Sequence, residues 1–273
     1  MKVVLFCGGK GTRLRDYSET IPKPMVKIGY RPILWHVMKY YAYHGHNDFI
    51  LCLGHQADVV KNFFLTYNEA ISNDFVIVGG GGEVRLLNTD IDDWKITFVD
   101  TGINSNIGER LVAVRDYLAD EEMFFVNYSD GVTNLPLPDN LDAFERSGKV
   151  ASLVAVKPTQ SFYAVSLGGD DRVIGIDPIK DTGIWLNGGF FIFRPEIFDY
   201  MRPGEELALE PFKRLIAEGQ LMAYRYDGFW QAMDTFKDKQ YLEDLYASGD
   251  APWELWNRRG NRAKTALRAA VQA

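Results

Sequence analysis

Residues 3–14 read Val-Val-Leu-Phe-Cys-Gly-Gly-Lys-Gly-Thr-Arg-Leu, an apolar run that passes directly into a glycine-rich loop. A short continuous apolar run is typical of a strand buried on both faces of a parallel sheet. Glycines let the backbone approach a ligand closely and present N–H groups to anionic oxygens. The stretch therefore predicts a phosphate-binding loop after a central strand, with Gly8, Gly9, Gly11 and Thr12 as its backbone donors.

The loop fits neither of two widespread phosphate-binding patterns. The Walker A pattern requires a lysine followed by serine or threonine, whereas Lys10 is followed by Gly11. The dinucleotide-binding pattern requires a third glycine where Leu14 stands. Arg13 adds a guanidinium group that can bind a phosphate through two parallel hydrogen bonds. The sequence thus favours a phosphate ligand held by a loop of another kind.

Strand and helix patterns alternate downstream of this loop. Apolar spacing predicts a helix over 32–43, a buried strand over 49–53 that ends at Gly54, and a helix over 59–65. Further strands are predicted over 123–128, 150–156 and 185–193, and further helices over 110–118, 207–217 and 235–246. The segment 75–99 is more β-like. This alternation predicts an α/β fold, doubly wound, with a mostly parallel central sheet.

Composition and charge exclude several classes of protein. The chain has 273 residues, of which 47% are apolar, and a formal net charge of −7, which argues against disorder and against nucleic-acid binding. Cys7 and Cys52 lie in apolar runs, so we expect core residues rather than a disulfide framework or a zinc site. The N-terminal apolar run is too short for a signal peptide or a membrane span, which predicts a cytoplasmic protein without a membrane partner.

A second motif follows the glycine-rich loop. In Pro22-Lys23-Pro24-Met25 two prolines fix the backbone of a lysine and so aim its ammonium group. Together the two motifs resemble those of the sugar nucleotidyltransferases, which join a sugar 1-phosphate to an NTP and release pyrophosphate. The similarity is greatest to the glucose-1-phosphate cytidylyltransferase branch. It extends over nearly all of residues 1–256 through Pro32-Ile33-Leu34-Trp35-His36, Asn47-Asp48-Phe49-Ile50, Val99-Asp100-Thr101-Gly102, Arg110-Leu111, Asp130-Gly131, Asn187-Gly188-Gly189-Phe190-Phe191, Gly228-Phe229-Trp230-Gln231, Met233-Asp234-Thr235 and Ala251-Pro252-Trp253.

This resemblance implies a domain organisation. It implies one Rossmann-like nucleotidyltransferase domain over 1–256, with an NTP-binding part over about 1–130 and a partly β-rich sugar-binding part over about 131–256. CTP and a sugar 1-phosphate are the implied substrates, Mg²⁺ is the implied cofactor, and a homo-oligomer is the implied assembly. The basic segment 257–273 is expected to be a solvated helix or tail, or an arm that docks on an acidic neighbouring subunit.

The resemblance also implies roles for individual residues. Lys23 would bridge the two reacting phosphates, and Asp130 and Asp234 would hold Mg²⁺. Arg13 would act both in catalysis and in binding the triphosphate. Asn187 and Gly188 would lie on the sugar side. The full set of implied nucleotide-binding residues is Gly8, Gly9, Gly11, Thr12, Arg13, Gly54 and Arg110.

The chain departs from the family pattern on the sugar side. Asp177-Pro178-Ile179 stands where the family has Glu-Lys-Pro, so Pro178 replaces a lysine that meets the sugar phosphate or hydroxyls. Lys180 would reach the same pocket if the segment is extended, because residues two apart on a strand share a face. Tyr163 stands where the family has a glycine beside the sugar. We therefore expect Lys180 to bind the sugar, and Tyr163 either to bind it or to turn into the core. Glucose 1-phosphate is expected to be a weak acceptor or not the true one, with another sugar 1-phosphate or small phosphate, or another NTP, as alternatives.

The sequence also permits two functions of other classes, a glycosyltransferase and a non-catalytic sensor. A nucleotide-sugar glycosyltransferase shares the doubly wound fold and often uses an Asp-x-Asp metal motif, which Asp90-Ile91-Asp92 matches by letter. It has no need, however, of the Gly-Thr-Arg-Leu loop together with Pro-Lys-Pro. A non-catalytic sensor of nucleotide sugars would not need Lys23 and both aspartates. Release of pyrophosphate from an NTP distinguishes these readings from a nucleotidyltransferase.

Overall fold

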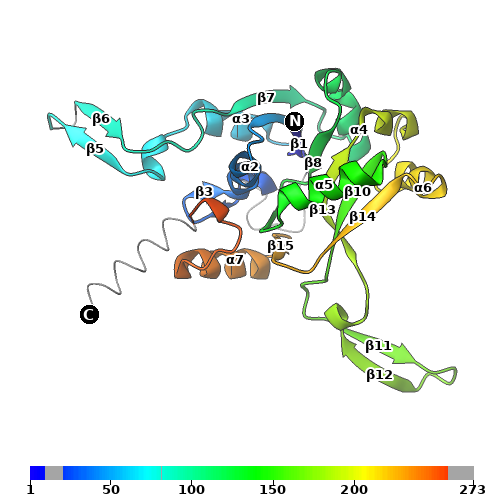
Figure 1. The fold of residues 1–273 in the computed structure, drawn as a ribbon. Coiled ribbons are helices and arrows are strands. Elements are labelled where there is room, and N and C mark those ends of the chain that lie inside the picture. Colours follow the sequence, from blue (N-terminus) through cyan, green and yellow to red (C-terminus); the bar gives the residue numbers. More distant parts are fainter. Residues whose placement is uncertain (10–20, 81, 258–273) are drawn as a thin grey trace.

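A seven-stranded sheet forms the centre of the molecule in the computed structural model, which describes residues 1–9, 21–80 and 82–257 (Figure 1). Its strands are β1 (Lys2–Phe6), β4 (Asp48–Leu53), β7 (Lys95–Asp100), β8 (Phe124–Asn127), β10 (Ala151–Val156), β13 (Leu186–Phe193) and β14 (Leu221–Tyr226). They lie in the order β14-β10-β13-β8-β1-β4-β7. Of these seven, β13 runs antiparallel to both neighbours, while the other pairings are parallel. The predicted doubly wound, mostly parallel sheet is confirmed.

Strand β1 shows why this sheet is buried on both faces. Val3 and Leu5 belong to one hydrophobic cluster, whereas Val4 and Phe6 belong to the other, as the period of two along a strand requires. Each large apolar side chain buried in this way contributes about 1.5–3 kcal/mol. Core residues of the first face come from α2 (Ile33–Tyr43), α3 (Ala57–Leu65), α5 (Leu137–Ser147) and α7 (Phe236–Ser248), and those of the second from α4 (Ile107–Ala113) and α6 (Glu210–Ala217).

The helix predicted over 110–118 begins and ends earlier than expected. Asn106 and Glu109 form a capping box that starts α4 at Ile107, because each side chain satisfies a free backbone N–H of the first turn. The helix ends at Ala113, and a separate 3-10 turn covers Arg115–Leu118. This shift places the start of α4 beside the carboxyl ends of the strands, where Ile107 lines a pocket.

Four short strand pairs lie outside the central sheet. They are β2 (Lys27–Ile28) with β3 (Arg31–Pro32), β5 (Phe75–Val78) with β6 (Glu83–Leu86), β9 (Gly131–Thr133) with β15 (Trp230–Ala232), and β11 (Tyr163–Leu167) with β12 (Val173–Pro178). The β5–β6 and β11–β12 hairpins project away from the body of the molecule in different directions (Figure 1). The β9–β15 pair matters most for the site, since it places Gly131 opposite Ala232 and so brings two distant loops together. Among the described residues, no helix is both long enough and apolar enough to cross a membrane.

Two glycines allow a matched test of the packing behind the site. Gly189 in β13 has a φ of +74°, and a Cβ atom there would lie 2.7 Å from the Tyr128 ring. Gly148 ends α5 with a φ of +61°, and a Cβ atom there would meet open space. We expect Gly148→Ala to lower the free energy of unfolding by about 1 kcal/mol through backbone strain alone. Gly189→Ala should lower it by at least 1 kcal/mol more, because strain and collision add. Urea unfolding measures both values, and equal losses would contradict this packing.

Candidate active site

Several loops with predicted functional residues meet at the carboxyl ends of the parallel strands. The loop after β1 begins with Cys7, Gly8 and Gly9, and the loop after β8 contains Asp130. Ligands of open parallel sheets bind at this edge. Lys23 begins the 3-10 turn η2 (Lys23–Met25), and Asp234 follows β15.

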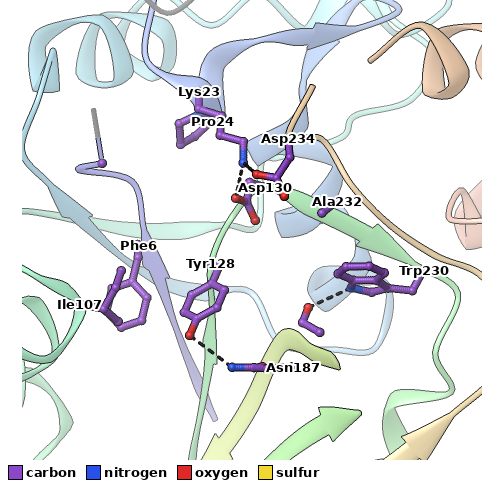
Figure 2. A pocket seen from close by; sticks show the side chains of 12 residues that line it. Phe6, Lys23, Pro24, Ile107, Tyr128, Asp130, Asn187, Trp230, Ala232 and Asp234 are labelled. Atoms are coloured by element: carbon purple, nitrogen blue, oxygen red, sulfur yellow. Dashed lines mark hydrogen bonds and ion pairs between the residues drawn. The ribbon is translucent and has the colours of Figure 1, made fainter. Parts of the chain in front are cut away.

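The Lys23 ammonium group lies between the Asp130 and Asp234 carboxylates (Figure 2). Its Nζ donates to Asp130 Oδ2 at 2.6 Å and to Asp234 Oδ1 at 2.7 Å. The side chains are 13%, 27% and 36% exposed respectively, so these charges are only partly screened by water. Burial disfavours the charged form of Lys23, but the attraction of the two carboxylates outweighs it and raises the pKa of Lys23 above its ordinary value.

Backbone hydrogen bonds hold both aspartates in place. The N–H of Met233 donates to the carbonyl of Asp130 at 2.8 Å, which ties the two loops together. The N–H of Asp234 donates to Asp238 Oδ2 at 3.1 Å. Asp238 also forms the capping box of α7 with Thr235, so the first turn of this helix anchors Asp234.

Ser129 fixes the direction in which the chain leaves β8 toward Asp130. Its φ of +61° lies in the left-handed region, which residues other than glycine adopt rarely. Its fully buried hydroxyl donates to the carbonyl of Phe6 at 2.5 Å, and its N–H donates to Asn127 Oδ1 at 2.6 Å. These bonds hold the strained turn against the end of β1. The role of Ser129 cannot be predicted from the sequence, because nothing in a Tyr-Ser-Asp-Gly stretch signals a positive φ at serine.

A pocket of about 480 Å³ opens over this charged cluster. Figure 2 shows Lys23 and both aspartates on one wall, Phe6 and Ile107 on another, and Tyr128, Asn187 and Trp230 on the wall away from Lys23. Gly9, Pro24, Gly188 and Ala232 also line it. One cavity therefore brings together Gly9, Lys23, Asp130, Asn187, Gly188 and Asp234, six residues singled out from the sequence.

Tyr128 and Trp230 shape the side of the pocket that contains Asn187. The amide of Asn187 donates to the Tyr128 hydroxyl at 3.4 Å, and Asn187 Oδ1 accepts from the Gly189 N–H at 2.9 Å. The Trp230 indole N–H donates to the carbonyl of Gly188 at 2.8 Å. Trp230 belongs to one of the matching motifs, but the sequence predicts no role for either aromatic residue. Their signal was only their position, Tyr128 two residues before Asp130 and Trp230 four before Asp234.

Arg110 lies beneath the loops rather than in the pocket. Its buried guanidinium donates to the carbonyl of Leu53 at 3.0 Å, to Thr101 Oγ1 at 2.7 Å and to the carbonyl of Gly8 at 3.0 Å. These acceptors lie at the ends of three adjacent strands, β4, β7 and β1. Arg110 is therefore a positioning residue that joins three loops. We expected it to bind the nucleotide, but it is not among the described residues that line the pocket.

The same guanidinium explains two of the predicted glycines. A Cβ atom at Gly8 would lie 2.1 Å from an Arg110 nitrogen, and one at Gly54 would lie 2.7 Å from it. Both contacts are closer than real Cβ atoms tolerate. A side chain at Gly8 would therefore displace the guanidinium group from its hydrogen bonds, and one at Gly54 would also meet the Gly102 carbonyl oxygen at 2.8 Å.

Tyr163 and Lys180 line a different pocket. This second cavity, of about 680 Å³, shares Trp230 with the first and also includes Pro178 and Lys237 in its walls. Lys180 lies in a 3-10 turn, Ile179–Asp181, rather than in an extended strand, yet it does share a pocket with position 178 as expected. The structure does not bring Tyr163 or Lys180 into the cavity that holds Lys23 and the aspartates.

Asp90 is part of a buried network, which disfavours the glycosyltransferase reading. The carboxylate of Asp90 accepts from the Tyr67 hydroxyl at 2.8 Å and from the Ser72 hydroxyl at 2.6 Å, and Arg31 Nη2 lies 3.6 Å away. Asp90 is only 6% exposed. Its carboxylate therefore serves internal bonds instead of an open metal site.

The two aspartates of the pocket are suited to a divalent cation. Both reach the same ammonium nitrogen, so their oxygens are close enough to share one positive ion. Within the described parts of the chain, no group of three His, Cys, Asp or Glu side chains could hold a metal by itself. Two carboxylates completed by substrate oxygens are the arrangement that Mg²⁺ commonly takes.

Some predicted residues lie outside the described residues. Gly11, Thr12 and Arg13 fall in the segment 10–20, and the basic tail falls almost entirely in 258–273.

Comparison with known sequences assigns the chain to a family. The profile of the nucleotidyl transferase family matches residues 2–243. The chain belongs to this family. A glucose-1-phosphate cytidylyltransferase of Salmonella typhimurium is 40% identical over 258 residues, covering 94% of this chain and 100% of that protein. The protein of the same name from Salmonella typhi gives the same values.

Solved structures show the same fold at low sequence identity. A UDP-glucose pyrophosphorylase complexed with UDP-glucose aligns with a TM-score of 0.67 at 15% identity, covering 91% of this nucleotidyltransferase and 98% of that chain. HddC from Yersinia pseudotuberculosis aligns with a TM-score of 0.63 at 19% identity, covering 90% and 99%.

Replacing Arg110 tests its role as a positioning residue. Arg110→Met should lower the free energy of unfolding by about 2 kcal/mol, because buried acceptors at three strand ends lose a charged donor. Arg146→Met, at an exposed position of α5, is the matched control and should change it by less than about 0.5 kcal/mol. Urea denaturation measures both. Wild-type stability in Arg110→Met would mean that the guanidinium does not hold the loops.

Proposed function

We propose that this chain transfers the cytidylyl group of CTP to glucose 1-phosphate, giving CDP-glucose and pyrophosphate. The observation that carries the proposal is the pairing of Lys23 with Asp130 and Asp234 in a pocket at the strand ends. Such a cluster supplies positive charge and metal-binding oxygens where phosphates react. The choice of CTP and of glucose rests on the full-length likeness to relatives with that name.

The proposed chemistry is a single in-line displacement at phosphorus. An oxygen of the sugar 1-phosphate forms a bond to the α-phosphorus of CTP, and the bond from that phosphorus to the α–β bridging oxygen breaks. Pyrophosphate leaves with the electron pair. A phosphate monoester is largely ionised at neutral pH, since its second pKa is about 6. The attacking oxygen therefore needs no general base, and the described lining residues include no histidine.

Lys23 and the two aspartates would have different roles in neutralising the phosphate charges. The Lys23 ammonium group would draw the acceptor phosphate and the α-phosphate together against their mutual repulsion. Asp130 and Asp234 would hold Mg²⁺, and this ion would neutralise charge on the phosphate oxygens of CTP. The backbone of each aspartate is fixed by the bonds described above, so both residues are held at the pocket before substrate arrives.

The two ends of the pocket suit the two substrates. We place the triphosphate at Gly9, with Gly11, Thr12 and Arg13 as further contacts, and the sugar at Asn187 and Gly188 beside Tyr128 and Trp230. This division corresponds to an NTP-binding part over about 1–130 and a sugar-binding part over about 131–256. Gly8, Gly54 and Arg110 support the nucleotide end from below.

An acceptor other than glucose 1-phosphate is not favoured. Tyr163 and Pro178, the residues that depart from the family pattern, line the second pocket and do not line the pocket that holds Lys23 and the aspartates. We propose that Tyr163 and Lys180 influence the sugar end only through Trp230, which borders both pockets.

We also propose a homo-oligomer in a reducing compartment, the cytoplasm. A two-stranded hairpin is marginally stable alone, and exposed apolar patches mark interfaces. Both projecting hairpins expose apolar side chains, among them Ile77, Val84, Val165 and Ile174. Cys7 and Cys52 are free buried thiols, and burial raises the pKa of Cys7 to about 12.

A substrate matrix tests the proposed function. Purified protein is incubated with each of CTP, UTP, dTTP, ATP and GTP against glucose, galactose and mannose 1-phosphates, with pyrophosphate release as readout. CTP with glucose 1-phosphate should give the highest kcat/KM, at about 10⁴ M⁻¹s⁻¹ or above. A higher value with another pair would refute the substrate assignment, and no release from any pair would refute the transferase.

Substitution of the aspartates tests the reaction centre. Asp130→Asn and Asp234→Asn should each lower kcat by about 10²-fold or more, because the phosphates lose the metal that neutralises them. Asp92→Asn, at an exposed position, is the matched control and should keep the wild-type rate. Rates near wild type in either pocket variant would remove Asp130 or Asp234 from the mechanism.

A further inference from the structure

Lys23 contacts the two aspartates in the structure and would contact two phosphates in the proposed reaction. In the structure its Nζ lies 2.6 Å from Asp130 Oδ2 and 2.7 Å from Asp234 Oδ1. In the proposed reaction, the same Nζ lies between two phosphates while both carboxylates bind a divalent cation. Two of its three N–H donors serve the carboxylates in the structure, so an ammonium group that contacts two phosphates while the carboxylates bind a cation has to give up at least one of these bonds.

The ammonium group and a divalent cation would compete for the same space. Mg²⁺ binds carboxylate oxygens at about 2.0–2.1 Å. A cation shared by Asp130 Oδ2 and Asp234 Oδ1 would lie between the same two oxygens that now accept from Lys23. Two positive charges at such short range also repel each other strongly in a partly buried pocket.

The local backbone lets the side chain move by itself. Pro22 and Pro24 flank Lys23, and Pro24 is buried. The Met25 N–H donates to the carbonyl of Pro22 at 2.8 Å, and the Val26 N–H donates to that of Lys23 at 3.1 Å. Because the turn is fixed, the ammonium group can relocate by rotation about the four side-chain bonds of lysine, without a backbone shift.

We infer that Lys23 acts as a built-in counter-ion of the metal site in the free protein and exchanges with the divalent cation when CTP enters. This inference rests on the proposed function. It predicts that a divalent cation alone binds the free protein weakly, because it must displace Lys23. CTP offers the ammonium group a new anionic partner, so nucleotide and metal strengthen each other's binding by the same factor.

The test measures metal binding to the free protein, without nucleotide. Mn²⁺ is titrated into wild type, Lys23→Gln, Lys23→Met and Lys23→Arg. Electron paramagnetic resonance measures the Mn²⁺ that remains free after each addition. Lys23→Gln and Lys23→Met remove the charge and should bind Mn²⁺ about tenfold more tightly, within the usual range of coupling between two ligands. Lys23→Arg keeps the charge and should bind as weakly as wild type. Lys27→Gln, at an exposed neighbouring lysine, should match wild type.

The outcomes separate this inference from the proposed function. Urea unfolding first establishes which variants are folded. Because Lys23→Gln and Lys23→Met both remove the charge, the test can still be made if one of them does not fold. Unchanged or weaker Mn²⁺ binding in a folded uncharged variant would overturn the exchange. If that result is obtained and Asp130→Asn abolishes Mn²⁺ binding, the exchange fails while the metal site stands. If Asp130→Asn binds Mn²⁺ as wild type does, the metal site itself fails, and the exchange with it.

Discussion

The ion cluster of Lys23, Asp130 and Asp234 is the constraint on which the rest of the site depends. Asp130 and Asp234 lie 107 and 211 residues after Lys23 in the sequence, so tertiary structure alone brings the three together. Two partly buried carboxylates repel each other, and removing them from water costs free energy unless a cation is present. Lys23 meets this need in the free protein. The same electrostatic demand makes the cluster a place where a metal ion and phosphates can bind.

The surrounding structure holds the loops of this cluster in position. Arg110 joins the ends of β1, β4 and β7 through one buried guanidinium group. Ser129 fastens the end of β8 to the end of β1. The β9–β15 pair and the capping box of α7 then place Asp234 opposite Asp130. All these contacts are made within the protein, so the carboxylates are preorganised, as electrostatic stabilisation of a transition state requires.

The sequence predicts the sheet and the reaction centre better than it predicts what supports them. Strand 3–7, helix 32–43 and the loop aspartates carry local signals, namely periodicity, glycines and matching motifs. Helix α5 was not predicted, because Leu137–Ser147 is largely polar and buries few side chains. The motif around Arg110 predicts a contact with the nucleotide, but motif position cannot show that the guanidinium group also donates to three strand ends. The family pattern predicts that Tyr163 and Lys180 lie beside the sugar, but no pattern shows that they line a second pocket, which shares Trp230 with the first.

The most direct test of this account is a single diffraction measurement. Crystals grown with Mn²⁺ and a non-hydrolysable CTP analogue would locate the ion by its anomalous scattering. Exchange of Lys23 with the metal ion predicts one Mn²⁺ peak between the Asp130 and Asp234 carboxylates, with the Lys23 ammonium group moved onto the phosphates. A peak elsewhere, with Lys23 still bridging both aspartates at the distances found here, would contradict it.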